Sequence, residues 1–384
     1  MVHPSCKDAA SAMPAPITLF LAGDVMTGRG VDQILARPSG PELHEPFVKD
    51  AQEYVRLAER ASGPVPRGAA SDYIWGDAPA AWERMAPAAR IVNLETSITR
   101  SNDYDRGKSI HYRMHPDNSG CLAAAHFDVC ALANNHVLDY GREGLIETLQ
   151  TLDRAHIRAV GAGRTRDEAV RPAVHALPGG EHLIVGACAH ESSGVPDQWA
   201  ALTEEPGVYL LPDLGDDTAA AVAAGVAGHK LPGDIAVLSI HWGDNWGYDV
   251  PRQHINFAHR LVEGGIDIVY GHSSHHVRPI EIYRERLILY GCGDFIDDYE
   301  GIAGYEQYRD DLVLMFFPSL NPATGQLVTL QLTPMQIRNI RLNRASAADV
   351  RWVCDTLNRV SRSFGVQAEL MSDGALKILG RLPR

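Results

Sequence analysis

The sequence predicts an α/β fold, and two features of the 384-residue chain carry that prediction. The first is a series of short apolar runs, mostly β-branched, each as long as a strand and each stopped by a polar residue. The second is that segments with helical spacing lie between these runs. Strand, helix and strand in alternation are typical of an α/β protein.

The strand-like runs end at side chains that suit a metal ion. They are residues 17–23 before Asp24, 90–94 before Glu95, 127–133 before Asn134-Asn135-His136, 235–240 before His241, 266–271 before His272 and 287–293 before Asp294. A further run, 183–188, precedes His190 and Glu191.

Two intervening segments show one apolar face at helical spacing. Residues 144–156 carry Leu145, Leu149 and Leu152, and residues 252–264 show a similar face. In open α/β sheets, ligands sit beyond the carboxyl ends of the strands. We therefore expect the strand-end side chains to gather around one cleft.

Composition limits the partners. The chain is 45% hydrophobic and 22% charged, and 35 Lys plus Arg against 48 Asp plus Glu give a net charge of -13. Attraction to a phosphate backbone cannot drive binding over such a surface, so nucleic acid is excluded as a partner. A small anionic substrate remains compatible, because a metal and a few arginines reverse the potential locally.

Cysteine usage and the N-terminus favour the cytoplasm. The six cysteines form no CxxC pair, which is typical of buried thiols in a reducing compartment. Residues 1–16 lack the apolar segment of an export signal, and the apolar stretch 17–22 is far shorter than a membrane span. We expect a cytoplasmic protein without a membrane anchor.

The strand-end side chains predict metal-assisted hydrolysis, which needs oxygen and imidazole ligands around a water that loses its proton near neutral pH. The predicted ligands are Asp24, Glu95, Asn135, His241, His272 and His275. A single histidine at a strand end is more often a hydrogen-bonded core residue, but the joint pattern argues against that interpretation. One or two ions of Mn, Fe or Zn suit such a set.

The segment Asn134-Asn135-His136 has two interpretations. Asn134 suits a turn, because asparagine tolerates left-handed backbone angles and caps helices. His136 follows a neutral ligand and is well positioned to protonate a leaving group, so we predict that it is the catalytic acid.

Order, spacing and identity of several motifs resemble the CapA-type poly-gamma-glutamate synthesis proteins of the calcineurin-like metallophosphoesterase superfamily. The motifs are Gly23-Asp24-Val25-Met26-Thr27-Gly28-Arg29, Val92-Asn93-Leu94-Glu95-Thr96, Tyr112-Arg113-Met114-His115-Pro116, Leu132-Ala133-Asn134-Asn135-His136-Val137-Leu138-Asp139-Tyr140-Gly141, His241-Trp242-Gly243, Gly271-His272-Ser273-Ser274-His275 and Tyr290-Gly291-Cys292-Gly293-Asp294-Phe295. The resemblance runs from Ile17 to about Pro334.

The resemblance implies a four-layer α/β/β/α sandwich of the calcineurin-like metallophosphatase type, with the metal centre at one edge. It places Glu95 as the bridging carboxylate and puts Asn135, His241 and His272 on one metal. Asp24 and His275 would hold the other metal, and His136 would assist the leaving group.

The resemblance also sets the domain boundaries. The metallophosphatase-like domain covers residues 17–334, with an insertion at about 37–77 in which 48–61 has helical character. Residues 1–16 are expected to be disordered or loosely packed. Residues 335–384 are expected to pack on the same domain, and we predict a strand pair at 327–332 and 337–342 and a helix at about 347–364.

The chain departs from the superfamily pattern at several positions. Met26 stands where the superfamily motif Asp-x-His has its histidine, so one ligand of the first metal is missing. Ser273 and Ser274 replace a usual His-Pro, which leaves His275 and His276 as alternative ligands, with His275 favoured by register. Asp294 stands where the family usually has asparagine and adds negative charge near the cleft.

Arg29 and Arg113 are the candidate substrate contacts, because a guanidinium matches carboxylate or phosphate oxygens. Structural salt bridges are an equally good interpretation of both. Trp242, Trp246 and Tyr248 follow a predicted ligand and suit either a cleft wall or plain packing.

Two functions follow. The first is a metal-dependent hydrolase that acts on an anionic small molecule or a polyglutamate-like substrate. The bond is a phosphoester or a glutamate-linked amide, with the phosphoester slightly favoured on chemistry. The second is a non-catalytic component in synthesis or binding of a poly-gamma-glutamate type polymer. The sequence leaves the oligomeric state open.

Overall fold

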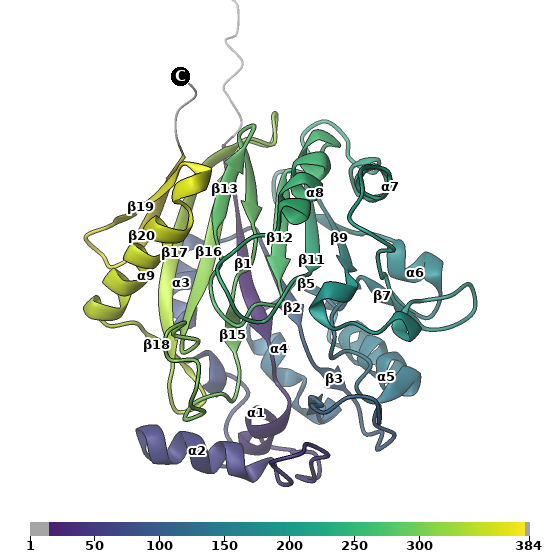
Figure 1. Cartoon of the computed structure of the whole chain (residues 1–384), viewed down its shortest axis with the longest axis vertical. Helices are drawn as coiled ribbons and strands as arrows, with labels where there is room; N and C mark the ends of the chain where they lie inside the picture. Colours follow the sequence, from purple (N-terminus) through teal and green to yellow (C-terminus); the bar gives the residue numbers. More distant parts are fainter. Residues whose placement is uncertain (1–14, 381–384) are drawn as a thin grey trace, which may run out of the picture.

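The computed structural model describes residues 15–380 as a mixed α/β protein with one large mixed sheet, a second sheet and flanking helices (Figure 1). This confirms the predicted α/β class. The loose segment predicted for residues 1–16 lies almost wholly outside the described residues.

The larger sheet has ten strands. Its order is β19-β20-β17-β16-β1-β2-β5-β6, with β15 beside β1 and β18 beside β17. The strands are β1 (Ile17–Val25), β2 (Ala89–Leu94), β5 (Val129–Ala131), β6 (Arg158–Val160), β15 (Asp294–Ile296), β16 (Leu312–Leu320), β17 (Leu327–Ile337), β18 (Leu342–Arg344), β19 (Val366–Leu370) and β20 (Leu376–Gly380). β1, β2, β5 and β6 run parallel, so their carboxyl ends meet at one edge.

The second sheet has six strands in the order β13-β14-β12-β11-β9-β8. They are β8 (Ala173–Ala176), β9 (His182–Ala189), β11 (Ile235–His241), β12 (Ile268–His272), β13 (Ile280–Tyr283) and β14 (Arg286–Leu289). Two short pairs complete the strands: β3 (Ser97–Ile98) with β4 (Arg113–Met114), and β7 (Ala162–Gly163) with β10 (Gly207–Val208). β9, β11 and β12 are parallel, which brings His241 and His272 to the same register.

The helices cover the sheets and the ends of the strands. They are α1 (Arg29–Ile34), α2 (Gln52–Ser62), α3 (Ala78–Met85), α4 (Gly120–Ala124), α5 (Gly141–Arg154), α6 (Arg166–Val170), α7 (Asp216–Ala227), α8 (Arg252–Glu263) and α9 (Ala347–Val360). In Figure 1, β1 (purple) runs down the middle of the molecule, and α1 and α2 lie below its carboxyl end.

The two sheets share a core. Alternate residues of β11 face two different clusters: Ile240 packs with residues of α7 and α8, whereas Val237 belongs to the main cluster together with Leu21 of β1. Between the sheets, the Tyr270 hydroxyl of β12 donates to the carbonyl of Ala22 and accepts the amide of Asn93 at 3.2 Å. This buried tyrosine fixes β12 against β1 and β2.

The insertion at about 37–77 contributes to the core as well as to the surface. Trp75 is fully buried and packs edge-on against Phe127, with ring centroids 5.3 Å apart. Its indole N–H donates to the carbonyl of Cys121 at 2.7 Å. The insertion is therefore held by the same aromatic core that supports β1.

The predicted strand pair at 327–332 and 337–342 is wrong. Residues 327–337 form the single strand β17, which pairs with β16 along its length, including Leu314 opposite Pro334. Proline removes one donor without ending the strand, so the ladder continues past it. Asn339 and Ile340 have positive φ and form the turn to β18. β17 also spans the expected boundary at residue 334.

The described cysteines are all free thiols, and four of these five are buried, as predicted from their apolar surroundings. Within residues 15–380, no helix combines the length and apolarity that a membrane crossing requires.

His254, one of two histidines in α8, makes the stability of the fold depend on pH. His254 is 5% exposed and stacks on Trp242 with centroids 4.6 Å apart. Burial lowers its pKa from 6.5 to about 4, with Arg278 and His190 adding to the effect. As the pH falls, this histidine is protonated in the unfolded chain before it is protonated in the folded chain. The neutral ring of His254 therefore makes its full contribution to the free energy of unfolding above pH 6.5, and this contribution is lost as the pH falls toward 4.

We expect His254→Gln to reduce the acid sensitivity of the fold. Between pH 7 and pH 5, the wild-type chain should lose about 2 kcal/mol more unfolding free energy than the variant. Urea unfolding at the two pH values measures the difference. Equal losses in both proteins would contradict this account of His254.

Candidate metal centre

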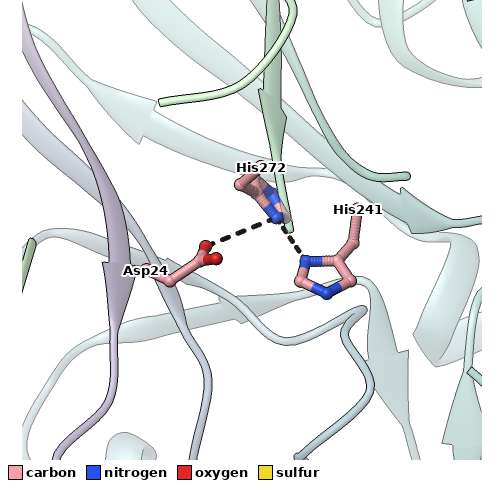
Figure 2. A group of neighbouring side chains, drawn as sticks. All are labelled: Asp24, His241 and His272. Carbon is pink, nitrogen blue, oxygen red and sulfur yellow. Dashed lines mark hydrogen bonds and ion pairs between the residues drawn. The ribbon is translucent and has the colours of Figure 1, made fainter. Parts of the chain in front are cut away.

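The first ligand group consists of Asp24, His241 and His272, which end or nearly end β1, β11 and β12. Figure 2 shows the three side chains pointing toward one another. The Nδ1 atoms of the two histidines are 2.7 Å apart, and Oδ1 of Asp24 lies 3.8 Å from Nδ1 of His272. None is more than 1% exposed. Carboxylate and imidazole ligands in this arrangement could hold a metal ion.

The second ligand group consists of Asp24, His275 and Asp294. Nδ1 of His275 lies 2.9 Å from Oδ1 of Asp294, and Asp294 pairs in register with Asp24 because β15 runs beside β1. The ligand atoms in each group all lie within 4.8 Å of one another. The two groups therefore share one carboxylate, that of Asp24.

The remaining predicted ligands lie at the edges of these groups. Oδ1 of Asn135 is 3.2 Å from Nε2 of His241, on the side of the ring away from His272. Glu95 is connected to Asp24 through Asn93, whose Nδ2 donates to Asp24 at 2.8 Å and to Glu95 at 3.2 Å. The structure thus brings all six predicted ligand side chains into one region.

Of the two neighbouring histidines after β12, His275 faces the acids. His276 instead hydrogen-bonds the carbonyl of Val277 at 3.0 Å and stacks on Tyr308. The geometry agrees with the register argument that favoured His275.

The electrostatics of the site suit a cation. Burial raises the pKa of Glu95 well above its ordinary value, and the negative charge of Asp24 raises it further. Burial and Asp24 likewise raise the pKa of Asp294. Burial lowers the pKa of His272 to about 3, which keeps its ring neutral and able to bind a metal. Crowded carboxylates beside neutral imidazoles form a donor set that fits a divalent metal.

His136 is held by an acid and points into the site. Its Nδ1 lies 2.6 Å from Oδ2 of Asp139, and its Nε2 lies 3.9 Å from Oε1 of Glu95. Lys108 is 2.5 Å from the other oxygen of Asp139 and donates to the carbonyl of Asn135. Burial raises the pKa of Asp139, but His136 and Lys108 outweigh burial and hold it below its ordinary value.

The protonation state of His136 follows from these contacts. Burial lowers its pKa to about 4, so the ring is neutral near pH 7. The Asp139 carboxylate accepts the proton of Nδ1, which leaves a lone pair on Nε2 facing Glu95. The ring is therefore ready to accept a proton at Nε2.

The two predicted substrate arginines lie in different environments. Arg29 is 4% exposed; its Nε donates to Asp298 at 3.1 Å and its Nη1 donates to Glu45 at 2.9 Å. Arg113 is half-buried and donates at 2.7 Å to two neutral oxygens, those of the Ser101 carbonyl and the Asn102 amide. The charge of Arg29 is thus compensated, whereas Arg113 forms no ion pair with any residue between 15 and 380.

The aromatic residues after His241 also lie in different environments. Trp242 is 2% exposed and donates to the carbonyl of Tyr290 at 3.1 Å, which is a packing role. Trp246 is half-buried, 5.4 Å from the ring of His275 and stacked on Tyr305 at 3.8 Å. Only Trp246 stands beside a ligand group.

Two residues of the site, Asn93 and Lys108, were not predicted from the sequence, and a third, Asp294, was predicted in a different role. Asp294 ended one of the strand-like runs, which was the signal that it is a ligand candidate, but it was interpreted only as extra charge. Asn93 precedes Glu95 by two residues and so shares its face of β2, a signal that went unused. Lys108 lies in a loop without periodicity, and no sequence pattern marked it.

Asn134 forms the predicted turn, since its Oδ1 accepts the amides of His136 and Val137.

We expect Asn93→Ala to weaken metal binding by about 10- to 100-fold. The change removes the amide that donates to both Asp24 and Glu95 and that Asn134 orients through a hydrogen bond of 3.0 Å. Competition with a chromogenic chelator measures the affinity. Asn358→Ala, which removes a side chain bonded to Ala368 in the C-terminal region, is the matched control. Equal affinities in the two variants would contradict the role of Asn93.

Comparison with known proteins shows the family of the chain. The family model described as "Bacterial capsule synthesis protein PGA_cap" matches residues 18–299. A "Probable polyglutamine synthesis accessory protein" of Mycobacterium tuberculosis is 48% identical over 367 residues, which cover 95% of this chain and 97% of the relative. The "PGA biosynthesis protein CapA" of Bacillus subtilis is 26% identical over 84% of this chain and 72% of its own length. The "Capsule biosynthesis protein CapA" of Bacillus anthracis is 24% identical over 78% of this chain and 63% of its own length. The chain belongs to the PGA_cap, or CapA, family of bacterial capsule synthesis proteins.

Proposed function

We propose that the protein is a metal-dependent hydrolase that acts in the metabolism of a glutamate polymer of the poly-gamma-glutamate type. The observation that supports this most is the pair of buried ligand groups that share Asp24 and lie beside the His136–Asp139 pair. The hydrolysed bond is an amide linked to glutamate, or a phosphoester of a related anionic molecule.

The ligands for the metal are assigned by proximity. Asp24, His241 and His272, with Asn135 beside them, would hold one ion. Asp24, His275 and Asp294 would hold a second ion, with Glu95 nearby. An ion of Mn, Fe or Zn held by these residues would supply a Lewis acid and would lower the pKa of a water. Asp294 would supply a carboxylate to a centre that lacks a histidine at Met26.

His136 moves the proton. Its Nε2 accepts a proton from the attacking water and then gives that proton to the leaving atom, because the ring is neutral at rest and Asp139 stabilises the charged form. In this scheme His136 acts first as a base and then as the acid predicted from the sequence. Lys108 keeps Asp139 ionised and so positions His136.

The substrate class follows from the rim and from the relatives. The positive charge of Lys108 reaches Glu95 in the site, and Arg113 carries a guanidinium that forms no ion pair among residues 15–380; both suit an anionic substrate. The relatives are named for polyglutamine, PGA and capsule synthesis, and these names favour a glutamate-linked amide over a phosphoester. We also propose that the two sheets form the α/β/β/α sandwich of the calcineurin-like metallophosphatases, an arrangement that the shared core and the Tyr270 contact support.

The test is a parallel screen of γ-glutamyl amides and phosphoesters, with Mn, Fe and Zn supplied in turn to the metal-stripped protein. We expect one substrate class to be hydrolysed only in the presence of metal. Metal analysis accompanies the screen. Absence of bound metal together with no gain of activity on adding any of the three would exclude the hydrolase.

The second candidate is a non-catalytic component that binds the polymer during its synthesis. Met26, fully buried where the superfamily has a metal-binding histidine, favours it. Binding of poly-gamma-glutamate without turnover in the presence of each metal would support this function in place of hydrolysis.

Replacement of Arg113 should affect substrate binding more than turnover. Arg113→Ala removes a guanidinium that has only neutral partners, so KM for an anionic substrate should rise by about 10- to 100-fold while kcat changes little. Steady-state kinetics measures both constants. Arg351→Ala, in the exposed part of α9, is the control with the same loss of charge. An unchanged KM would remove Arg113 from the substrate site.

A further inference from the structure

A buried network centred on Arg29 connects two histidines of the site that have different proposed roles, His136 and His275. The guanidinium donates to Asp298 at 3.1 Å from Nε and to Glu45 at 2.9 Å from Nη1. Both carboxylates are at most 2% exposed. Because both acids bind the same guanidinium away from water, the ion pairs fix the position of Arg29.

The glycines on both sides of Arg29 let other residues surround it. A Cβ on Gly28 would lie 3.0 Å from Cα of Tyr112, and a Cβ on Gly30 would lie 2.9 Å from Cβ of Tyr54. Arg29 itself has a φ of 46°, in the left-handed region that a non-glycine residue seldom adopts. Such a conformation persists only where the surrounding structure imposes it, and it occurs most often at functional sites.

Two tyrosine rings extend the contacts of Arg29 to the histidines. Cζ of Arg29 lies 4.5 Å from the ring centroid of Tyr112 and 5.7 Å from that of Tyr299. The Tyr112 ring lies edge-on to His136, with centroids 4.5 Å apart. The Tyr299 ring lies edge-on to His275, with centroids 5.2 Å apart. Each tyrosine ring therefore contacts one of the two histidines.

One hydrogen bond joins the two tyrosines. The Tyr112 hydroxyl donates to the Tyr299 hydroxyl at 2.9 Å. The backbone amide of Tyr112 also donates to Oδ2 of Asp139 at 2.7 Å, the same oxygen that lies beside Nδ1 of His136. Tyr112 thus contacts His136 directly through its ring and indirectly through Asp139. A continuous chain of contacts runs from His136 through the two hydroxyls to His275.

We infer that Arg29 and the two tyrosines are positioning residues, which fix the ring of His136 relative to that of His275. Proton transfer requires Nε2 of His136 within hydrogen-bonding distance of the reacting atoms, and a displacement of about 1 Å costs roughly 100-fold in rate. A shared support for both rings keeps this distance constant. The benefit for turnover rests on the proposed function, whereas the coupling of the two rings does not.

Tyrosine-to-phenylalanine variants test the coupling, because they remove the bond between the hydroxyls and keep the rings. In the metal-free full chain with isotopically labelled histidine, NMR follows the imidazole nitrogens, and substitution of each histidine by glutamine assigns its signals. Tyr112→Phe should shift the signals of His275 as well as those of His136, and Tyr299→Phe should do the same. Tyr73→Phe removes a hydroxyl bonded to a backbone carbonyl at 2.9 Å and is the matched control, expected to shift neither.

The result that would overturn the inference is a purely local one. It is a shift confined to the nearest histidine, namely to His136 in Tyr112→Phe and to His275 in Tyr299→Phe. Arg29→Lys keeps the positive charge but loses the planar fork, so it should shift the signals of both histidines. If Arg29→Lys does not fold, the two tyrosine variants decide the inference alone.

Turnover measures the consequence for proton transfer. Each single variant, Tyr112→Phe or Tyr299→Phe, should lower kcat by about 2- to 10-fold with little change in KM, as expected for loss of one hydrogen bond. The double variant should be no slower than either single variant, because all three lack the same bond. Multiplied effects in the double variant would show that the hydroxyls act separately and would also overturn the inference.

The NMR measurement needs neither metal nor turnover. A failed substrate screen would therefore remove the proposed function and leave the expected signal shifts unchanged. Shifts confined to the nearest histidine would overturn the coupling even in a protein that hydrolyses its substrate.

Discussion

The Asp24→Asn variant is expected to lose metal from both ligand groups at once and to lower turnover by about 1000-fold, equivalent to about 4 kcal/mol of transition-state stabilisation. The reason is that Asp24 is the one carboxylate common to both groups. Metal analysis of the purified variant and steady-state kinetics measure the two effects. His275→Ala removes a ligand from the second group only, so it should retain the ion of the first group.

Loss of metal in Asp24→Asn should not come from unfolding. Burial raises the pKa of Asp24, which means that the ionised carboxylate destabilises the metal-free fold, and asparagine removes that charge at nearly the same size. We expect the Tm of the metal-free variant to equal or exceed that of the metal-free wild type. Full metal content in Asp24→Asn would show that this carboxylate is not a ligand.

The second large effect is expected for His136→Ala. Turnover should fall by about 100- to 10,000-fold, the range for loss of a general acid or base, while metal content stays unchanged. Turnover should fall without loss of metal because Nε2 of His136 lies 3.9 Å from Oε1 of Glu95 and the ring belongs to neither ligand group. Added imidazole should restore part of the activity.

The control for His136 is His229→Ala, an exposed histidine just after α7. It should retain both metal and turnover. If His136→Ala keeps wild-type turnover, proton transfer occurs elsewhere; if it loses metal, His136 is a structural support of the centre.

The strand-end pattern predicted which side chains lie close together because parallel strands bring their carboxyl ends to one edge of a sheet. β1 runs parallel to β2 in one sheet and β11 runs parallel to β12 in the other, so the carboxyl ends within each pair lie at the same edge of the sheet. The proximity of His241 and His272 could therefore be predicted from local patterns, whereas the approach of Asp24 to them depends on how the two sheets pack. The register of His241 opposite His272 follows from the same geometry.

Contacts that depend on tertiary placement could not be predicted. Asp294 follows a strand-like run, but its position beside Asp24 depends on the pairing of the three-residue strand β15 with β1, and β15 is too short to show periodicity. The partner of Arg29 is Asp298, 269 residues away, and no local pattern connects them. Lys108 reaches Asp139 from an irregular loop. The contacts of such residues depend on the tertiary structure and not on the hydrophobic periodicity of a helix or strand.

The ligand groups combine residues that lie far apart in the sequence, and this has a consequence for the synthesis of the protein. The centre needs Asp24 from the first strand and residues near Ser273, which lies 249 positions later. At typical rates of synthesis the first of these waits roughly 10 to 50 seconds for the second to leave the ribosome. Until then the early strands have no second sheet to cover them, and no nascent fragment ending before β12 holds a complete ligand group. A metal that these groups could hold can therefore be bound completely only by the nearly finished chain, and products of premature termination before β12 lack a complete ligand group.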